Sequence, residues 1–234
     1  MNAVELNNTG AVFLDSGDYG NAARVLVEGM QSYKQLVLAI QQADNNELSF
    51  LGERGIDSLM EKSRCLRLRE YGEDNWGKAG AYIYMQPIHI PIDNSRTAEF
   101  CNGGVITILA SLMFNLALSR HLLAIASKQN SEALLRKAAH LYQFGLSLQG
   151  SGTGSWNFFA VVSLNNLGTV YRALEESETS ERYFSELLFV TSQLTRSKGN
   201  PASDGSIYNA FYSTSAVQVL VFQKLGVKVS AAAA

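Results

Sequence analysis

The stretch from Ser163 to Leu188 constrains the fold most, because it has the pattern of two amphipathic helices joined by a short turn. Apolar and small residues recur at the helical period through its first half: Leu164, Leu167, Gly168, Tyr171 and Leu174. A polar turn, Glu175 to Thr179, precedes a second run with the same period. Helices with so short a connection lie antiparallel, and Gly168 lets them approach closely. Such a hairpin leaves an apolar face uncovered, so it predicts neighbours of the same kind.

A second hairpin is predicted at the start of the chain, between Ala3 and Met30. Its two helical runs are separated by Asp15-Ser16-Gly17-Asp18, whose Gly and Asp residues are typical of helix ends and caps. The second run keeps its helical period to about Ile40, so we expect this helix to be long.

Both hairpins resemble tetratricopeptide (TPR) repeats, which place small and large residues at fixed offsets in two antiparallel helices. In the first hairpin the matching residues are Gly10, Phe13, Gly17, Tyr19, Ala22, Leu26 and Gly29. In the later hairpin they are Leu167, Gly168, Tyr171, Phe184 and Leu188. A middle copy opens with Asn115-Leu116-Ala117 and closes with Ala138, Tyr142, Gly145 and Leu146, with a longer insert and Arg120 at the family's Tyr position.

The resemblance implies an all-α, TPR-like solenoid, a right-handed superhelix forming one domain over residues 1–234. The expected parts are hairpins near 3–43, 104–149 and 156–196, an extended insert at 70–102 and a capping helix at 206–226. Gly10, Ala117 and Gly168 are 107 and 51 residues apart, so we expect an interrupted array with elongated helices. The succession of segments also resembles uncharacterised algal TPR-like proteins, which implies no function.

The interruption between Asn45 and Asn102 is the least repeat-like part of the chain. Its first part, to Arg69, has the period of one or two further helices, and a polar loop follows at 70–80. The run AYIYMQPIHIPI, residues 81–92, then alternates like a strand, but its two prolines limit it to a sheet edge or an isolated extended segment. Either it lies across the helices and seals a seam, or it forms a single hairpin or a strand-addition surface for a partner.

Composition excludes several classes of partner and chemistry. A formal net charge of −2, with scattered basic residues, does not favour nucleic-acid binding. The only cysteines, Cys65 and Cys101, lack His or Cys neighbours at metal-ligand spacing, so we expect two reduced thiols. We expect no cofactor and no small-molecule ligand.

The apolar run from Val105 to Ala126 is long enough to span a membrane. Arg120 and His121 lie in its second half, where insertion of a charge is unfavourable, so we expect a buried helix and no membrane insertion. The N-terminal residues lack the pattern of a signal peptide. We therefore expect a cytoplasmic protein, with import into an organelle left open.

The sequence contains no G-x-S-x-G, H-E-x-x-H or EF-hand motif, and we expect no catalytic residues and no enzyme. The Gly-rich stretch 150–154 lacks the lysine of a phosphate-binding loop and reads as an interhelical loop. His121 and His140 could meet across the middle hairpin, yet without a Cys or carboxylate partner they would make only a weak metal site.

One polar residue is shared by the three repeats. Asn8, Asn115 and Asn166 each stand two positions before the small residue of the first helix of their hairpin. The TPR resemblance implies that side chains near this position line a concave surface, where an amide can make both hydrogen bonds of a peptide unit. Asn7, Asn165 and Arg172 could extend this surface. Alternatively, the asparagines bond between adjacent stacked helices.

Two functions of different classes follow from this pattern. The first is a protein interaction scaffold that binds a peptide or partner subunit along these helices. The second is a permanent structural subunit of a larger assembly, with its apolar surfaces covered by neighbours. An enzyme that uses unrecognised residues is a third possibility.

Overall fold

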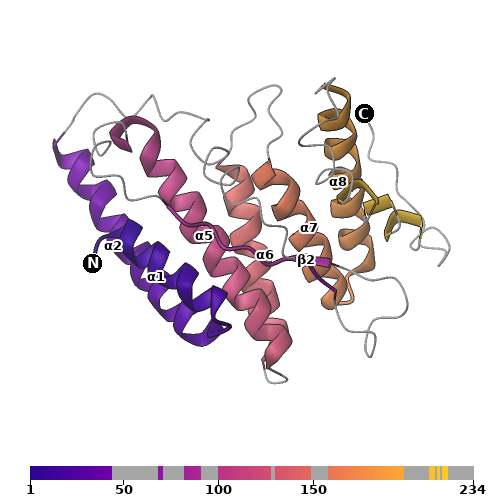
Figure 1. Cartoon of the computed structure of the whole chain (residues 1–234), viewed down its shortest axis with the longest axis horizontal. Coiled ribbons are helices and arrows are strands. Elements are labelled where there is room, and N and C mark those ends of the chain that lie inside the picture. The colour runs from indigo at the N-terminus through magenta and orange to yellow at the C-terminus, as the bar shows by residue number, and fades with distance from the viewer. Residues whose placement is uncertain are drawn as a thin grey trace. The chain divides into compact units, whose positions relative to one another are not determined.

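The computed structural model describes residues 1–43, 68–70, 82–90, 100–127, 130–148 and 158–197, and helical residues between 211 and 220. The bounded helices are α1 (Ala3–Asp15), α2 (Tyr19–Ala43), α5 (Phe100–Ala126), α6 (Ser131–Ser147), α7 (Phe158–Ala173) and α8 (Ser177–Ser197). The strands are β1 (Leu68–Glu70) and β2 (Tyr82–Tyr84). Consecutive helices pack as pairs: α1 with α2, α5 with α6, and α7 with α8 (Figure 1). The prediction of a mainly helical chain with adjacent helix packing is confirmed.

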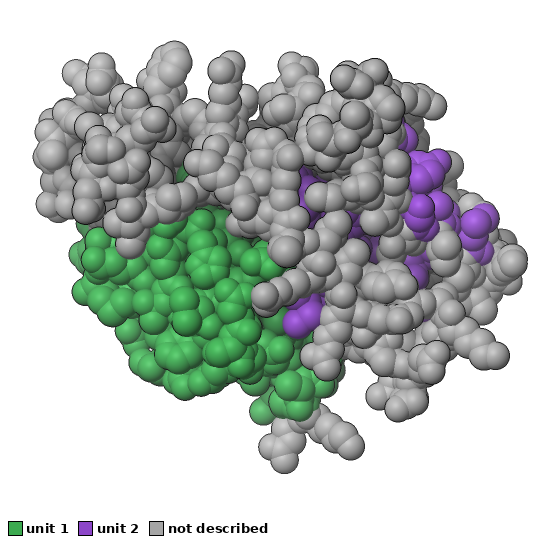
Figure 2. Space-filling model, viewed as in Figure 1, with its two compact units in different colours: residues 1–65, 86–153 green, residues 66–85, 154–234 purple. Residues whose placement is uncertain are grey.

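The chain divides into two compact units, which Figure 2 shows in different colours. Unit 1 consists of residues 1–65 and 86–153 and contains α1, α2, α5 and α6. Unit 2 consists of residues 66–85 and 154–234 and contains β1, β2, α7 and α8. The boundary between Met85 and Gln86 therefore falls inside the segment that the sequence predicts to be extended.

The first hairpin is defined by its caps. Asn2 and Glu5 form a reciprocal capping box at the start of α1, with the Glu5 N–H donating to Asn2 Oδ1 at 2.9 Å. Gly17 adopts a left-handed φ of 81° in the turn, which glycine does without a Cβ clash. The Asp18 side chain then accepts the Asn21 N–H at 3.1 Å in the first turn of α2. The predicted turn at 15–18 thus contains both helix ends.

Close contact within the hairpins depends on glycines in their first helices. A Cβ added to Gly10 would lie 2.5 Å from Leu26 Cγ, and one added to Gly168 would lie 2.7 Å from Phe184 Cζ. Both facing side chains are fully buried, so neither can swing aside. The Ser180 hydroxyl also donates to the Gly168 carbonyl at 2.7 Å across the α7–α8 pair.

Helix α5 is the most buried helix of unit 1. It packs against α1, α2 and α6, and side chains from Thr107 to Leu122 are mostly buried. Among the described residues it is the one helix whose length and composition would allow a membrane span, over Thr107–Ala126, but 78% of that window is buried by protein. Because α5 continues to Ala126, the extra residues of the middle repeat are additional helical turns.

The helical prediction for residues 45–69 is wrong at its end. Leu68–Glu70 forms strand β1, antiparallel to β2, with Arg69 opposite Ile83. The aromatic and β-branched residues of β2 offer a strand edge, and pairing with that edge overrides the local helical period. Several predictions fall outside the described residues: the helices before Leu68, the loop at 71–80, the Gly-rich stretch 150–154, and the side chains of Cys65 and Cys101.

Replacing Gly168 tests the close approach in the α7–α8 pair. We expect Gly168→Ala to lower the free energy of unfolding by about 1–3 kcal/mol, because the new methyl group overpacks against the buried Phe184 ring. Chemical denaturation followed by circular dichroism measures this change. Gly20→Ala is the matched control, since its added Cβ would lie 3.9 Å from Asp18 Oδ1, an ordinary van der Waals distance. Gly20→Ala should be neutral or stabilising by about 0.5–1 kcal/mol. Equal effects of the two substitutions would contradict the close contact between Gly168 and Phe184.

Candidate functional site

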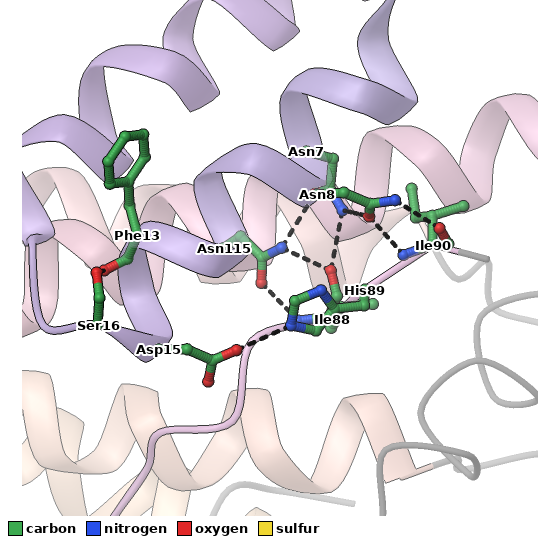
Figure 3. A network of polar contacts seen from close by, with 9 residues as sticks. All are labelled: Asn7, Asn8, Phe13, Asp15, Ser16, Ile88, His89, Ile90 and Asn115. Carbon is green, nitrogen blue, oxygen red and sulfur yellow. Dashed lines mark hydrogen bonds and ion pairs between the residues drawn. The ribbon is translucent and has the colours of Figure 1, made fainter. Parts of the chain in front are cut away.

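The backbone of a non-helical segment, residues 86–90, is bound by asparagines of unit 1; we call this segment the strap (Figure 3). Asn115, on α5, makes both hydrogen bonds to one residue of the strap. Its Oδ1 accepts the Ile88 N–H at 2.8 Å, and its Nδ2 donates to the Ile88 carbonyl at 2.8 Å. The Asn115 side chain is fully buried. It therefore binds one residue of the strap as a neighbouring β-strand would.

Asn8, on α1, repeats this arrangement two residues further along the strap. Its Oδ1 accepts the Ile90 N–H at 2.7 Å, and its Nδ2 donates to the Ile90 carbonyl at 2.6 Å. Asn8 is half-buried, whereas Ile88 and Ile90 are each 1% exposed. Between them, His89 Nε2 lies 3.0 Å from Asp15 Oδ2 at the end of α1.

Asn7 connects the two strap-binding asparagines and also joins α1 to α5. Its Oδ1 accepts from Asn115 Nδ2 at 3.0 Å, and its Nδ2 donates to the Ile88 carbonyl at 2.9 Å. A longer bond of 3.3 Å runs from Asn7 Nδ2 to Asn8 Oδ1. The network in Figure 3 thus contains both kinds of bond considered from the sequence, helix to peptide backbone and helix to helix.

Unit 2 contains an equivalent contact, between Asn166 on α7 and Tyr84 of β2. Asn166 Oδ1 accepts the Tyr84 N–H at 2.9 Å, and its Nδ2 donates to the Tyr84 carbonyl at 3.1 Å. Asn165 Nδ2 lies 3.2 Å from the same Oδ1, and both asparagines are fully buried. The Tyr84 ring packs edge-on against the Phe158 ring, with 5.6 Å between the ring centroids. Burial raises the pKa of the Tyr84 hydroxyl.

Alternation along the strap explains why Asn115 and Asn8 bind residues two positions apart. In an extended chain the N–H and C=O of residues i and i+2 point to the same edge. In the strap the bound residues are Ile88 and Ile90. In β2 the bound residue is Tyr84. Ile83, which is opposite Arg69 of β1, presents its backbone to the other edge.

Arg172, the remaining predicted site residue, is bonded elsewhere in unit 2. Its guanidinium donates to the Gln218 side chain, and half-burial lowers the pKa of the arginine. The structure therefore places Asn8, Asn115 and Asn166 on peptide backbone, Asn165 beside Asn166, and Arg172 on another helical segment.

The two histidines considered for a metal site differ in environment. His121 on α5 is fully buried, with its ring 6.3 Å from that of Tyr142, whereas His140 on α6 is exposed. Neither ring nitrogen of His121 has a hydrogen-bond partner in the part of the chain that is described, and desolvation lowers its pKa to about 3. Among those residues no group of three His, Cys, Asp or Glu side chains could hold a metal ion.

Sequence reasoning placed Asn7 only as an extension of the predicted surface, and it missed that the asparagines bind the chain's own extended segment. Two signals in the sequence could have indicated these contacts. Asparagines occur as adjacent pairs, Asn7-Asn8 and Asn165-Asn166, near the middle of two first helices. The segment 81–92 also has the alternation of a strand that needs a partner on each edge.

Comparisons with protein-family models, curated proteins and solved structures gave no match. Membership of the TPR family therefore stays a prediction from the repeat residues.

Replacing Asn115 tests how much its contact with the strap contributes to stability. We expect Asn115→Leu to lower the free energy of unfolding by about 2–3 kcal/mol, because the buried Ile88 N–H would lose its acceptor. Asn8→Leu should lower it by only about 1 kcal/mol, since water can reach this half-buried position. Urea denaturation measures both changes. Gln31→Ala, at an exposed position of α2, is the control and should stay within about 0.5 kcal/mol of wild type; an equally small effect for Asn115→Leu would contradict the assigned bonds.

His121 predicts a specific dependence of stability on pH. Its pKa rises from about 3 in the folded chain to the ordinary value of 6.5 on unfolding, so the unfolded state takes up a proton first as pH falls. Between about pH 7 and about pH 5, the stability of wild type should fall by about 2 kcal/mol relative to His121→Phe. Denaturation of both proteins across this range measures the difference. Parallel curves for the two proteins would show that His121 is not buried in its neutral form.

Proposed function

We propose that this chain is a protein interaction scaffold, a TPR-like helical repeat that recognises the backbone of extended polypeptide segments. One observation carries the proposal: Asn8, Asn115 and Asn166 each make both hydrogen bonds to the backbone of a single residue. Because an asparagine offers a donor and an acceptor on one short arm, this contact recognises an extended backbone whatever its side chains are. The strap would then occupy the place of a partner's peptide.

The affinity that such a site supports is moderate. Each hydrogen bond contributes about 1 kcal/mol net, so the four bonds of Asn8 and Asn115, with burial of apolar side chains, suit a micromolar peptide. A tethered segment competes at an effective concentration in the millimolar range. An outside peptide would therefore bind well only where the strap is released.

A second candidate, a permanent subunit of a larger assembly, is favoured by two other features. The strap already satisfies Asn115, which leaves this buried asparagine no spare group for an outside peptide. Phe144 on α6 and Phe189 on α8 are 43% and 56% exposed, and exposed aromatic side chains are frequent where subunits meet. In this case the strap is a fixed part of unit 1.

Binding of a peptide to a strap-released variant tests the scaffold proposal. The variant is the full chain with Ile88→Asp and Ile90→Asp, which removes the two buried side chains of the strap. A fluorescent peptide with the sequence of residues 82–92 should bind it with a micromolar Kd, measured by anisotropy. Wild type should bind the same peptide at least about tenfold more weakly, because its own strap competes. Adding Asn115→Leu to the released variant should abolish binding, and adding Gln31→Ala should not.

The outcomes separate the two candidates. A released variant that unfolds, or that stays folded and binds no peptide, contradicts the scaffold proposal, because a groove that opens for a partner must persist without its strap. Co-purification of wild type with a stoichiometric set of proteins, retained when Asn115 is changed, would then support the subunit. Circular dichroism establishes beforehand which variants are folded.

A further inference from the structure

Asn115 and Asn8 bind only backbone atoms of the strap, so any preference for a particular sequence has to come from contacts with its side chains. Pro87, Ile88 and Ile90 are buried, so these positions require apolar residues of a given size. His89 stands between the two isoleucines with its side chain 39% exposed, and its Nε2 lies 3.0 Å from Asp15 Oδ2. The strap therefore presents two buried β-branched residues with a nitrogen donor between them.

Asp15 occupies a position that helix electrostatics disfavour. It is the last residue of α1, where the negative end of the helix dipole repels a carboxylate. No basic residue lies in the last turn of α1 to offset it. The carboxylate instead meets His89 of the strap, as Figure 3 shows. A carboxylate placed in this way selects for a cation or an N–H donor on the bound segment.

We infer that the site of α1 and α5 selects partner peptides with a β-branched residue, a basic residue and a second β-branched residue in succession. This inference rests on the proposed function and adds the class of ligand. Asn115 and Asn8 hold the backbone of the two β-branched residues, as they hold Ile88 and Ile90. Asp15 then contacts the side chain of the residue between them, as it contacts His89 in the strap. The backbone contacts set the register, and Asp15 sets the preferred charge.

A charge series of peptides tests this selectivity on the strap-released variant, Ile88→Asp with Ile90→Asp. The peptides share the sequence of residues 82–92 and differ only in carrying His, Lys, Gln or Asp at the position of His89. The Lys peptide should bind about fivefold more tightly than the Gln peptide, and the Asp peptide at least about fivefold more weakly, as expected for a half-exposed pair. Asp15→Lys should reverse this order. Raising the salt concentration should reduce all of these differences.

The outcomes distinguish this inference from the function on which it rests. If no peptide binds, the scaffold proposal fails. If all four peptides bind equally, only the selectivity by Asp15 is overturned. A released variant that does not fold contradicts the scaffold proposal, and this inference with it. In wild type, the contact of Asp15 with the strap is tested separately: Asp15→Lys should lower the free energy of unfolding, and His89→Glu should restore it in the double mutant. Additive effects of these two changes would overturn the inference.

Discussion

The structure of this chain depends on hydrogen bonds between helix side chains and the backbone of a segment that lies against the helices. A helix uses its own N–H and C=O groups internally, so only side chains remain to satisfy a segment that lies against it. Asparagine is the shortest side chain that carries a separate N–H donor and C=O acceptor on one planar amide, as a peptide unit does. Asn115 and Asn8 supply these groups to Ile88 and Ile90 in unit 1, as Asn166 supplies them to Tyr84 in unit 2.

Burial makes these contacts necessary rather than incidental. Ile88, Ile90 and Tyr84 are almost entirely removed from water, so an unpaired backbone group at any of them would be strongly destabilising. Asparagine is a poor helix former, and each one in a helix interior is disfavoured by a few tenths of a kcal/mol relative to a good helix former. Two first helices nevertheless contain an adjacent pair of asparagines, Asn7-Asn8 and Asn165-Asn166. A role in recognising polypeptide backbone accounts for that choice.

The sequence predicts the parts of this structure that depend on local pattern. The turn between Asp15 and Asp18 and the close approach at Gly168 follow from helical period and residue size, and the shared asparagines were found by their spacing from small residues. The pairing of Leu68–Glu70 with β2 could not be predicted, because it depends on a distant strand edge. The bond between Asn115 and Ile88 likewise joins residues whose meeting depends on how the helices of unit 1 pack. The local sequence pattern therefore does not predict such contacts.

Amide hydrogen exchange tests the central claim, that asparagine side chains bind the strap backbone at alternate residues. The N–H groups of Ile88 and Ile90 donate to Asn115 and Asn8, whereas the N–H of His89 has no hydrogen-bond partner within the described segments. Residue-resolved exchange measured by NMR should therefore show slow exchange at Ile88 and Ile90 and fast exchange at His89 between them. Asn115→Leu should accelerate exchange at Ile88. Uniformly fast exchange along residues 88–90 of wild type would contradict the account.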